Sequence, residues 1–201
     1  MKDFKVLAIL LLASAAVGTT CAQDSFQAGT VADLAGKTFA FEGVNYTFPQ
    51  DDYSFSGSGV PPLPASAVAI RVDPSDPKSL LISCPFWALN QPGQSISIDI
   101  RFQVTGANVQ ESEQYHASAT GDAQISQSLT VAGNPPAISA SFRTATNGVN
   151  LPPAAWFSEG PHDVVVHISL LAGQKGTAVL RSYRMRFAHR ERQAGPAETK
   201  P

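Results

Sequence analysis

A strict alternation of apolar and polar side chains runs through residues 95–104, whose sequence is SISIDIRFQV. Isoleucine, phenylalanine and valine occupy every second position, and serine, aspartate, arginine and glutamine occupy the positions between them. A period of two residues is typical of a β-strand with one buried face and one solvated face. We therefore expect this segment to be a central strand of the fold.

Shorter segments with a similar or weaker alternation recur along the chain, separated by turn sequences rich in Gly, Pro, Asn and Asp, and we find no convincing amphipathic helix. About nine or ten strands with turns at roughly ten-residue spacing predict an all-β fold, an antiparallel two-sheet β-sandwich that is immunoglobulin-like or jelly-roll-like. The expected strands are residues 37–42, 44–48, 68–72, 79–83, 95–104, 109–120, 124–131, 138–144, 164–171 and 177–187.

The turn sequences also predict how neighbouring strands connect. Residues 37–48 should form a hairpin across Glu42-Gly43, and residues 164–187 should form the clearest hairpin of the fold. The Gly-, Ser- and Pro-rich residues 49–64 rule out a central strand and predict a long connection. We expect Tyr53 and Phe55 to hold this connection, including its flexible SGSG sequence, on the surface of the sheet.

The amino-terminal residues have the layout of a secretory signal peptide: two lysines within residues 1–5, an apolar run of about twelve residues, and a small polar stretch before Ala22. The run is short for a membrane span. We expect cleavage after Ala22, with Ala16 as another possible site and lipidation of Cys21 as a third outcome. The mature chain should then be secreted, periplasmic or extracellular, and should have no transmembrane helix.

The remaining residues are expected to form one domain, since 201 residues with 43% hydrophobic content are enough for a single core. We divide the chain into a signal peptide (residues 1–22), a polar lead-in (23–36), the β-sandwich (37–189) and a disordered tail (190–201). Cleavage after Ala22 leaves only Cys84, which we expect to be a buried core residue rather than a reactive thiol.

The order of several strands resembles that of a known protein family. Residues 80–87 (LLISCPFW), the strand at 95–104, residues 156–173 (WFSEGPHDVVVHISLLAG) and residues 178–187 (AVLRSYRMRF) carry the resemblance. They resemble uncharacterised secreted bacterial β-sandwich proteins, many of which end in a PEP-CTERM sorting tail. This chain departs from them at its end, where it has no closing hydrophobic span and no arginine run. The resemblance implies a secreted sandwich and transfers no active site.

Candidate chemistry is sparse along the chain. No nucleophile motif of the G-x-S-x-G kind is present, and the four histidines are scattered without metal-ligand spacing, with His167 on an outward strand position. Asp73 and Asp76 in DPSDP offer oxygens to calcium, but Asp-Pro is also ordinary turn chemistry. We expect no enzyme activity, no cofactor, no metal site and no nucleic-acid partner.

Three aromatic residues are candidates for stacking on a sugar, namely Trp87, Trp156 and Tyr53, because exposed aromatic rings in sandwich loops suit that role. The alternative, which we favour, is that the two tryptophans seal the ends of the core. Solvent exposure of either tryptophan in the folded protein would favour sugar binding.

Charge is distributed unevenly. Residues 23–174 hold five Lys or Arg against thirteen Asp or Glu, whereas residues 175–201 hold seven against two. Arg184, Arg186, Arg190 and Arg192 should form a positive strip that contacts an anionic envelope surface, or that only protects an edge strand from aggregation. We therefore expect a secreted, envelope-associated, non-enzymatic module with a structural or binding role. The alternative is a carbohydrate-binding module of a polysaccharide-processing system.

Overall fold

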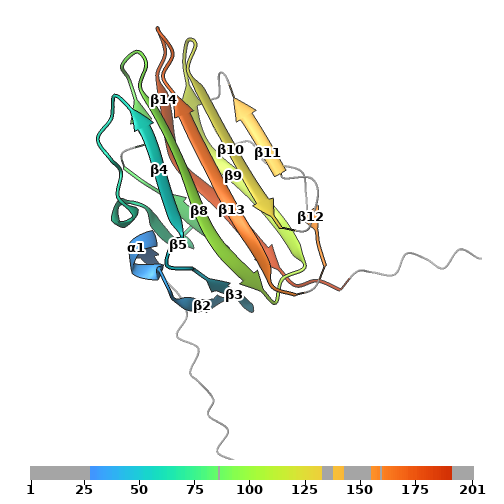
Figure 1. Cartoon of the computed structure of the whole chain (residues 1–201). Helices are drawn as coiled ribbons and strands as arrows, with labels where there is room; N and C mark the ends of the chain where they lie inside the picture. Colours follow the sequence, from blue (N-terminus) through green and yellow to red (C-terminus); the bar gives the residue numbers. More distant parts are fainter. Residues whose placement is uncertain (1–27, 86, 133–137, 143–154, 159, 192–201) are drawn as a thin grey trace, which may run out of the picture.

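The computed structural model describes residues 28–85, 87–132, 138–142, 155–158 and 160–191. These residues form two antiparallel β-sheets of seven strands each, which pack face to face (Figure 1). The predicted all-β two-sheet sandwich is confirmed. Within the described part of the chain, no helix is both long and apolar enough to cross a membrane.

The first sheet, which we call sheet A, has the strand order β1-β5-β6-β14-β9-β12, and β7 also pairs with β14. Its strands are β1 (Ala28–Thr30), β5 (Ala69–Asp73), β6 (Asp76–Ser83), β7 (Ala88–Leu89), β9 (Val109–Ala119), β12 (Ala155–Trp156) and β14 (Ala178–Ala188).

The second sheet, sheet B, has the order β11-β10-β13-β8-β3-β2, and β4 also pairs with β8. Its strands are β2 (Thr38–Phe41), β3 (Val44–Thr47), β4 (Tyr53–Ser58), β8 (Ser95–Thr105), β10 (Gln124–Val131), β11 (Ile138–Phe142) and β13 (His162–Leu171). A short helix α1 (Val31–Leu34) and a 3-10 turn η1 (Ala65–Ala67) lie between strands in the sequence.

The strand β8 occupies the centre of sheet B, as its alternation predicts. It pairs with β13 along one side, and with β4 and β3 along the other. Its burial alternates at every residue from Ser95 to Val104, and the Ile98 side chain is only 1% exposed. Because successive side chains of a strand point to opposite faces of the sheet, β8 places five apolar side chains in the core and five polar ones on the outer face of sheet B.

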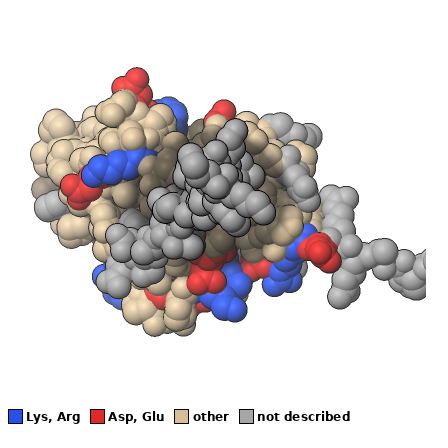
Figure 2. All heavy atoms as spheres, turned by 90° about the horizontal axis from the view of Figure 1, so that it is seen from below, with Lys and Arg blue, Asp and Glu red and all other residues tan. Residues whose placement is uncertain are grey.

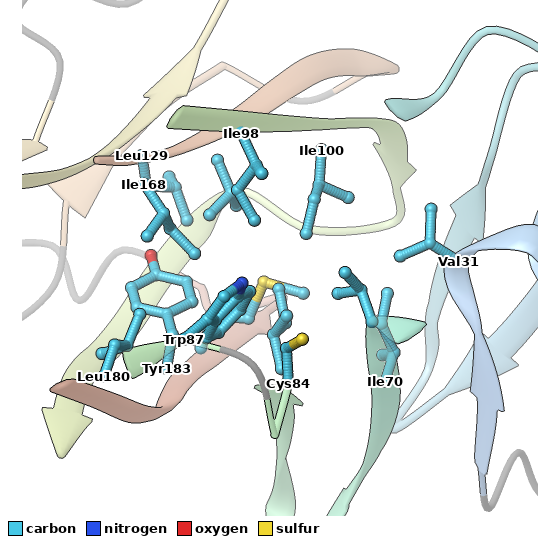
Figure 3. Close-up of a cluster of buried hydrophobic side chains, with 14 of the residues drawn as sticks. Val31, Ile70, Cys84, Trp87, Ile98, Ile100, Leu129, Ile168, Leu180 and Tyr183 are labelled. Carbon is cyan, nitrogen blue, oxygen red and sulfur yellow. The ribbon is translucent and has the colours of Figure 1, made fainter. Parts of the chain in front are cut away.

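The core lies between the two sheets (Figure 3). Trp87, Cys84 and Tyr183 approach from sheet A and its connections, and Ile98 and Ile168 approach from sheet B. Cys84 is buried and forms no disulfide, which confirms its prediction as a core residue. Packing of these side chains removes a large apolar area from water, which is the main source of stability for such a fold.

The two predicted hairpins have different outcomes. The β2–β3 hairpin is confirmed, and Glu42 and Gly43 both adopt the positive φ that a tight two-residue turn requires. The β13–β14 hairpin is wrong, because β13 belongs to sheet B and β14 to sheet A. The connection crosses between the sheets, and Asp122 holds it by accepting the backbone N–H groups of Gln174 (2.7 Å) and Lys175 (2.9 Å).

Two segments that the sequence assigned to connections belong to the fold. The predicted connection at residues 49–64 contains β4, which pairs with β8 and turns the rings of Tyr53 and Phe55 toward the core. The predicted polar lead-in contains β1 and α1, and Val31 of α1 is fully buried. β1 and α1, with three and four residues, are too short for a periodic pattern, so packing against the sandwich decides their structure.

Candidate functional site

The three predicted sugar-stacking aromatics do not form a shared surface. Trp87 is 1% exposed and lies among core side chains, so it offers no ring face to a ligand, and its assignment to a stacking site is wrong (Figure 3). Trp156 is half-buried on β12, at the edge of sheet A. Tyr53 turns toward the core from β4, and its hydroxyl donates to the Leu63 carbonyl at 2.9 Å.

The predicted arginine strip has acidic partners. Arg186 and Arg190 both pair with Glu111, with a distance of 2.7 Å from Arg186 Nε to Glu111 Oε2. Arg184 Nη1 lies 3.3 Å from Asp73 Oδ2. Figure 2 likewise shows basic and acidic atoms next to one another. The carboxylates are close because β14 pairs with β9, which carries Glu111, and with β6, whose other neighbour β5 carries Asp73. The described arginines therefore do not form the unpaired strip that the sequence suggests, and the expected edge strand is wrong, because β14 has a neighbour on each side. Arg192 lies outside the described residues.

The aspartates of the DPSDP turn are occupied by the turn itself. Asp73 Oδ1 accepts from the backbone N–H (2.8 Å) and the hydroxyl (2.7 Å) of Ser75, and Asp76 Oδ2 accepts from the Ser79 hydroxyl at 2.6 Å. Burial acts to raise the pKa of Asp73, but the hydrogen bonds from Ser75 and the charge of Arg184 outweigh it and hold the pKa below its ordinary value. No cluster of three or more metal-ligating side chains occurs within the part of the chain that the structure describes.

The outer face of sheet B carries an unusual run of short hydroxyl side chains. Their strands pair in the order β4, β8, β13 and β10, and the hydroxyl residues take the positions that alternate with core residues. We call this surface the hydroxyl face. Its members are Ser54, Ser56 and Ser58 of β4, Ser95 and Ser97 of β8, Ser169 of β13, and Ser126, Ser128 and Thr130 of β10.

The strand register aligns these residues into rows across the sheet. Ser56 pairs with Ser97, Ser97 with Ser169, and Ser169 with Ser126. Adjacent strands lie about 4.8 Å apart, so this row of four serines spans about 14 Å. Ser56 is exposed, and the other three serines of the row are partly exposed.

The next row contains a cluster of oriented polar groups, which we call the Asp99 cluster. Asp99 Oδ1 lies 2.6 Å from Nδ1 of His167, and Asp99 Oδ2 accepts from Arg101 Nη2 at 2.9 Å and from the Ser54 hydroxyl at 3.2 Å. His167 faces outward, as the alternation predicts. The Ser54 hydroxyl donates to the carboxylate and not to the imidazole, so the cluster lacks the nucleophile–base hydrogen bond of an acyl-transfer triad.

Beyond the Asp99 cluster the face is hollowed. This hollow has a volume of about 350 Å³, and its walls include Arg101, Gln103, Asp163, Val165 and Pro49. Gln103 Nε2 donates to Asp163 Oδ1 at 3.2 Å, so the amide and the carboxylate orient each other. The hollow therefore combines donors and acceptors with an apolar surface, in a volume suited to a small ligand.

Asp52 lies in the sequence just before β4 and is connected to the same face. Its carbonyl accepts the backbone N–H of Arg101 at 2.7 Å, and its side chain is 2% exposed with Oδ2 lacking a hydrogen-bond partner. Burial, and to a lesser extent the charge of Asp51, raises the pKa of Asp52. This carboxyl group therefore favours its neutral form more than an exposed aspartate does.

Only part of this site follows from the sequence. The alternation of β8 predicts that Ser97, Asp99, Arg101 and Gln103 share one wet face. It does not reveal which strands lie beside β8, and the serines of β4 were hidden in a segment interpreted as a loop. The signal that could have revealed them is the repeated Ser at every second position of residues 54–58.

No protein-family model and no curated protein matches the chain. Among solved structures it is similar to TmCBM61 in complex with β-1,4-galactotriose, at 10% identity over 68% of this chain and 89% of that chain, with a TM-score of 0.38. It is also similar to the xylan-binding module CBM15, at 14% identity over 74% of this chain and 98% of that chain, with a TM-score of 0.30. Because these scores are low, we take neither fold nor function from these likenesses.

Proposed function

We propose that this chain is a non-catalytic carbohydrate-binding module, and that the hydroxyl face and the hollow of sheet B contact a neutral polysaccharide. This is the alternative that the sequence left open beside a structural role. The observation that carries it is the combination, on one face of sheet B, of a serine row with a hollow that holds a guanidinium, an amide and a carboxylate around apolar groups. Sugar rings offer hydroxyls that both donate and accept, together with apolar C–H surfaces.

The charges of this face support a neutral polymer rather than an anionic one. Arg101 is neutralised by Asp99, and the other carboxylate, Asp163, is bonded to the uncharged Gln103. An anionic chain would gain little Coulomb attraction from such a surface, whereas a neutral chain needs only hydrogen bonds.

The serine side chains also favour weak and extended binding. A short hydroxyl side chain loses little rotamer freedom when it contacts a ligand. A hydrogen bond exchanged with water contributes only about 1 kcal/mol, and association itself costs several kcal/mol, so a few such bonds give weak binding. Secretion, predicted from residues 1–22, would expose this face to extracellular polymers.

Affinity electrophoresis and titration calorimetry against soluble neutral polysaccharides test the proposal. Ser97→Arg inserts a long charged side chain into the serine row and should weaken binding at least tenfold. The matched control Ser118→Arg makes the same change on the outer face of sheet A and should leave the affinity unchanged. Absence of any neutral polysaccharide that binds the wild-type chain, or equal losses in both variants, would overturn the proposal.

A further inference from the structure

A second concave site lies at the start of β8, and none of its lining residues belongs to the hydroxyl face. Its volume is about 600 Å³, and its walls come from residues 60–64, from Ala67, Pro85 and Ala88, and from Ile96 at the start of β8. Mainly apolar pockets of several hundred Å³ are the usual form of small-molecule sites. We call it the proline pocket, because its lining includes Pro61, Pro62, Pro64 and Pro85.

The proline pocket is formed before any ligand binds. Gln94 Nε2 donates to the Gly59 carbonyl at 3.0 Å, and the Tyr53 hydroxyl donates to the Leu63 carbonyl at 2.9 Å. These two bonds hold both ends of residues 59–63, and the prolines within and beside the segment fix its φ angles. Little conformational entropy is then lost on binding, which raises the affinity available from a modest contact area.

The groups in the wall restrict the chemistry of the ligand. Among the described residues that line the pocket none is charged, and proline has no backbone N–H to donate. The polar side chain in the lining is Gln94, whose Oε1 accepts from the backbone N–H groups of Asn90 (3.1 Å) and Gln91 (3.0 Å), and whose Nε2 is bonded to Gly59. An anionic or acceptor-rich ligand would lose its hydration here without a new partner, which costs several kcal/mol.

From these observations we infer that the proline pocket binds an uncharged aromatic small molecule whose polar group, where it has one, is a hydrogen-bond donor. Proline rings present C–H groups that carry a small positive charge, and the faces of aromatic rings are negative. Pro61, Pro62 and Pro64 each add a backbone carbonyl acceptor to this segment and no backbone donor that would compete for it. The inference is independent of the proposed polysaccharide site on sheet B.

A matched pair of fluorescent probes tests the chemistry. N-phenyl-1-naphthylamine is uncharged and has one N–H donor, and 8-anilinonaphthalene-1-sulfonate carries the same rings with an added sulfonate. Titration of the full chain should give saturable binding of one N-phenyl-1-naphthylamine per chain. The sulfonate should bind at least tenfold more weakly, because the described lining of the pocket offers no cation to pair with it.

Variants test the location. Ala88→Phe fills the pocket from its exposed wall and should reduce binding of N-phenyl-1-naphthylamine at least tenfold, whereas Ala132→Phe adds the same ring at an exposed position outside the pocket and should not. Val60→Trp fills the pocket from a second lining position and is used if the urea midpoint of Ala88→Phe shows that this variant does not fold. Tyr53→Phe, which releases the Leu63 carbonyl, should weaken binding several-fold.

The inference is wrong if the wild-type chain shows no saturable binding, if the sulfonate binds as tightly as the neutral probe, or if Ala88→Phe and Ala132→Phe lose affinity equally. Polysaccharide binding should be unchanged in Ala88→Phe. The two sites can therefore fail separately.

Discussion

Truncation of one core side chain on β8 should be far more damaging than truncation of its neighbour. Ile98 is 1% exposed and lies opposite Ile168 of β13 and Phe55 of β4, so both flanking strands surround it. Ile98→Ala removes three carbons, worth about 0.8 kcal/mol each, and leaves a cavity between packed sheets. We expect a loss of about 3 to 4 kcal/mol in the free energy of unfolding.

The control is Ser97→Ala. It also introduces an alanine, but at the neighbouring position of β8, which lies on the partly exposed outer face. Its effect should be within about 0.5 kcal/mol. Urea unfolding measures both variants: with a slope of about 2 kcal/mol/M, the midpoint of Ile98→Ala should fall by about 1.5 to 2 M, and that of Ser97→Ala should barely move. Equal midpoints would refute the assignment of the two faces of β8.

Three further predictions concern charge and reactivity. Arg184→Gln should destabilise the fold by about 1 to 2 kcal/mol in urea unfolding, because it leaves the buried Asp73 carboxylate without its cation, while the exposed Arg71→Gln should have little effect. The pKa of Asp52 is higher in the folded chain than in the unfolded chain, so protonation of its carboxyl group stabilises the fold. This contribution to the free energy of unfolding is complete below the ordinary pKa of 3.8, and it is lost as the pH rises through the pKa of the folded chain. Asp52→Asn should therefore raise the urea midpoint at neutral pH, and this gain should vanish below pH 3.8. A gain that grows on acidification would show that the pKa of Asp52 is not raised in the folded chain. Cys84 should react with a thiol reagent only after denaturant is added, and rapid reaction of the native chain would show that it is accessible.

The sequence by itself determined which side chains of β8 and β13 face the core, whereas in β14 a register shift between Leu180 and Ser182 changes the buried face and leaves Val179 only partly buried. The alternation in β8 and β13 needs only the two-residue period of a strand and the preference of apolar groups for burial. The β2–β3 hairpin followed for an equally local reason, since Glu42-Gly43 can adopt the backbone angles of a tight turn. The burial of Cys84 followed from the ordinary behaviour of a small apolar residue.

Only the tertiary structure decided which strands are neighbours. A period of two residues says that a strand has a wet face but not which sheet it joins, so β13 and β14 were assigned to one hairpin although they lie in different sheets. For the same reason the serines of β4 could not be placed beside those of β8, and the hydroxyl face could not be predicted from the sequence.

Contacts between residues far apart in the sequence also depend on which strands are neighbours. Arg184 and Asp73 are 111 residues apart in the chain, and they meet because β14 and β5 both flank β6. Trp87 is buried because the turn after β6 places it between the sheets, where the surrounding side chains cover it. Strand pairing is a property of the whole chain, since the entropy lost on closing long loops is recovered only when both sheets pack. The local pattern therefore specifies faces, and the packed sandwich specifies neighbours.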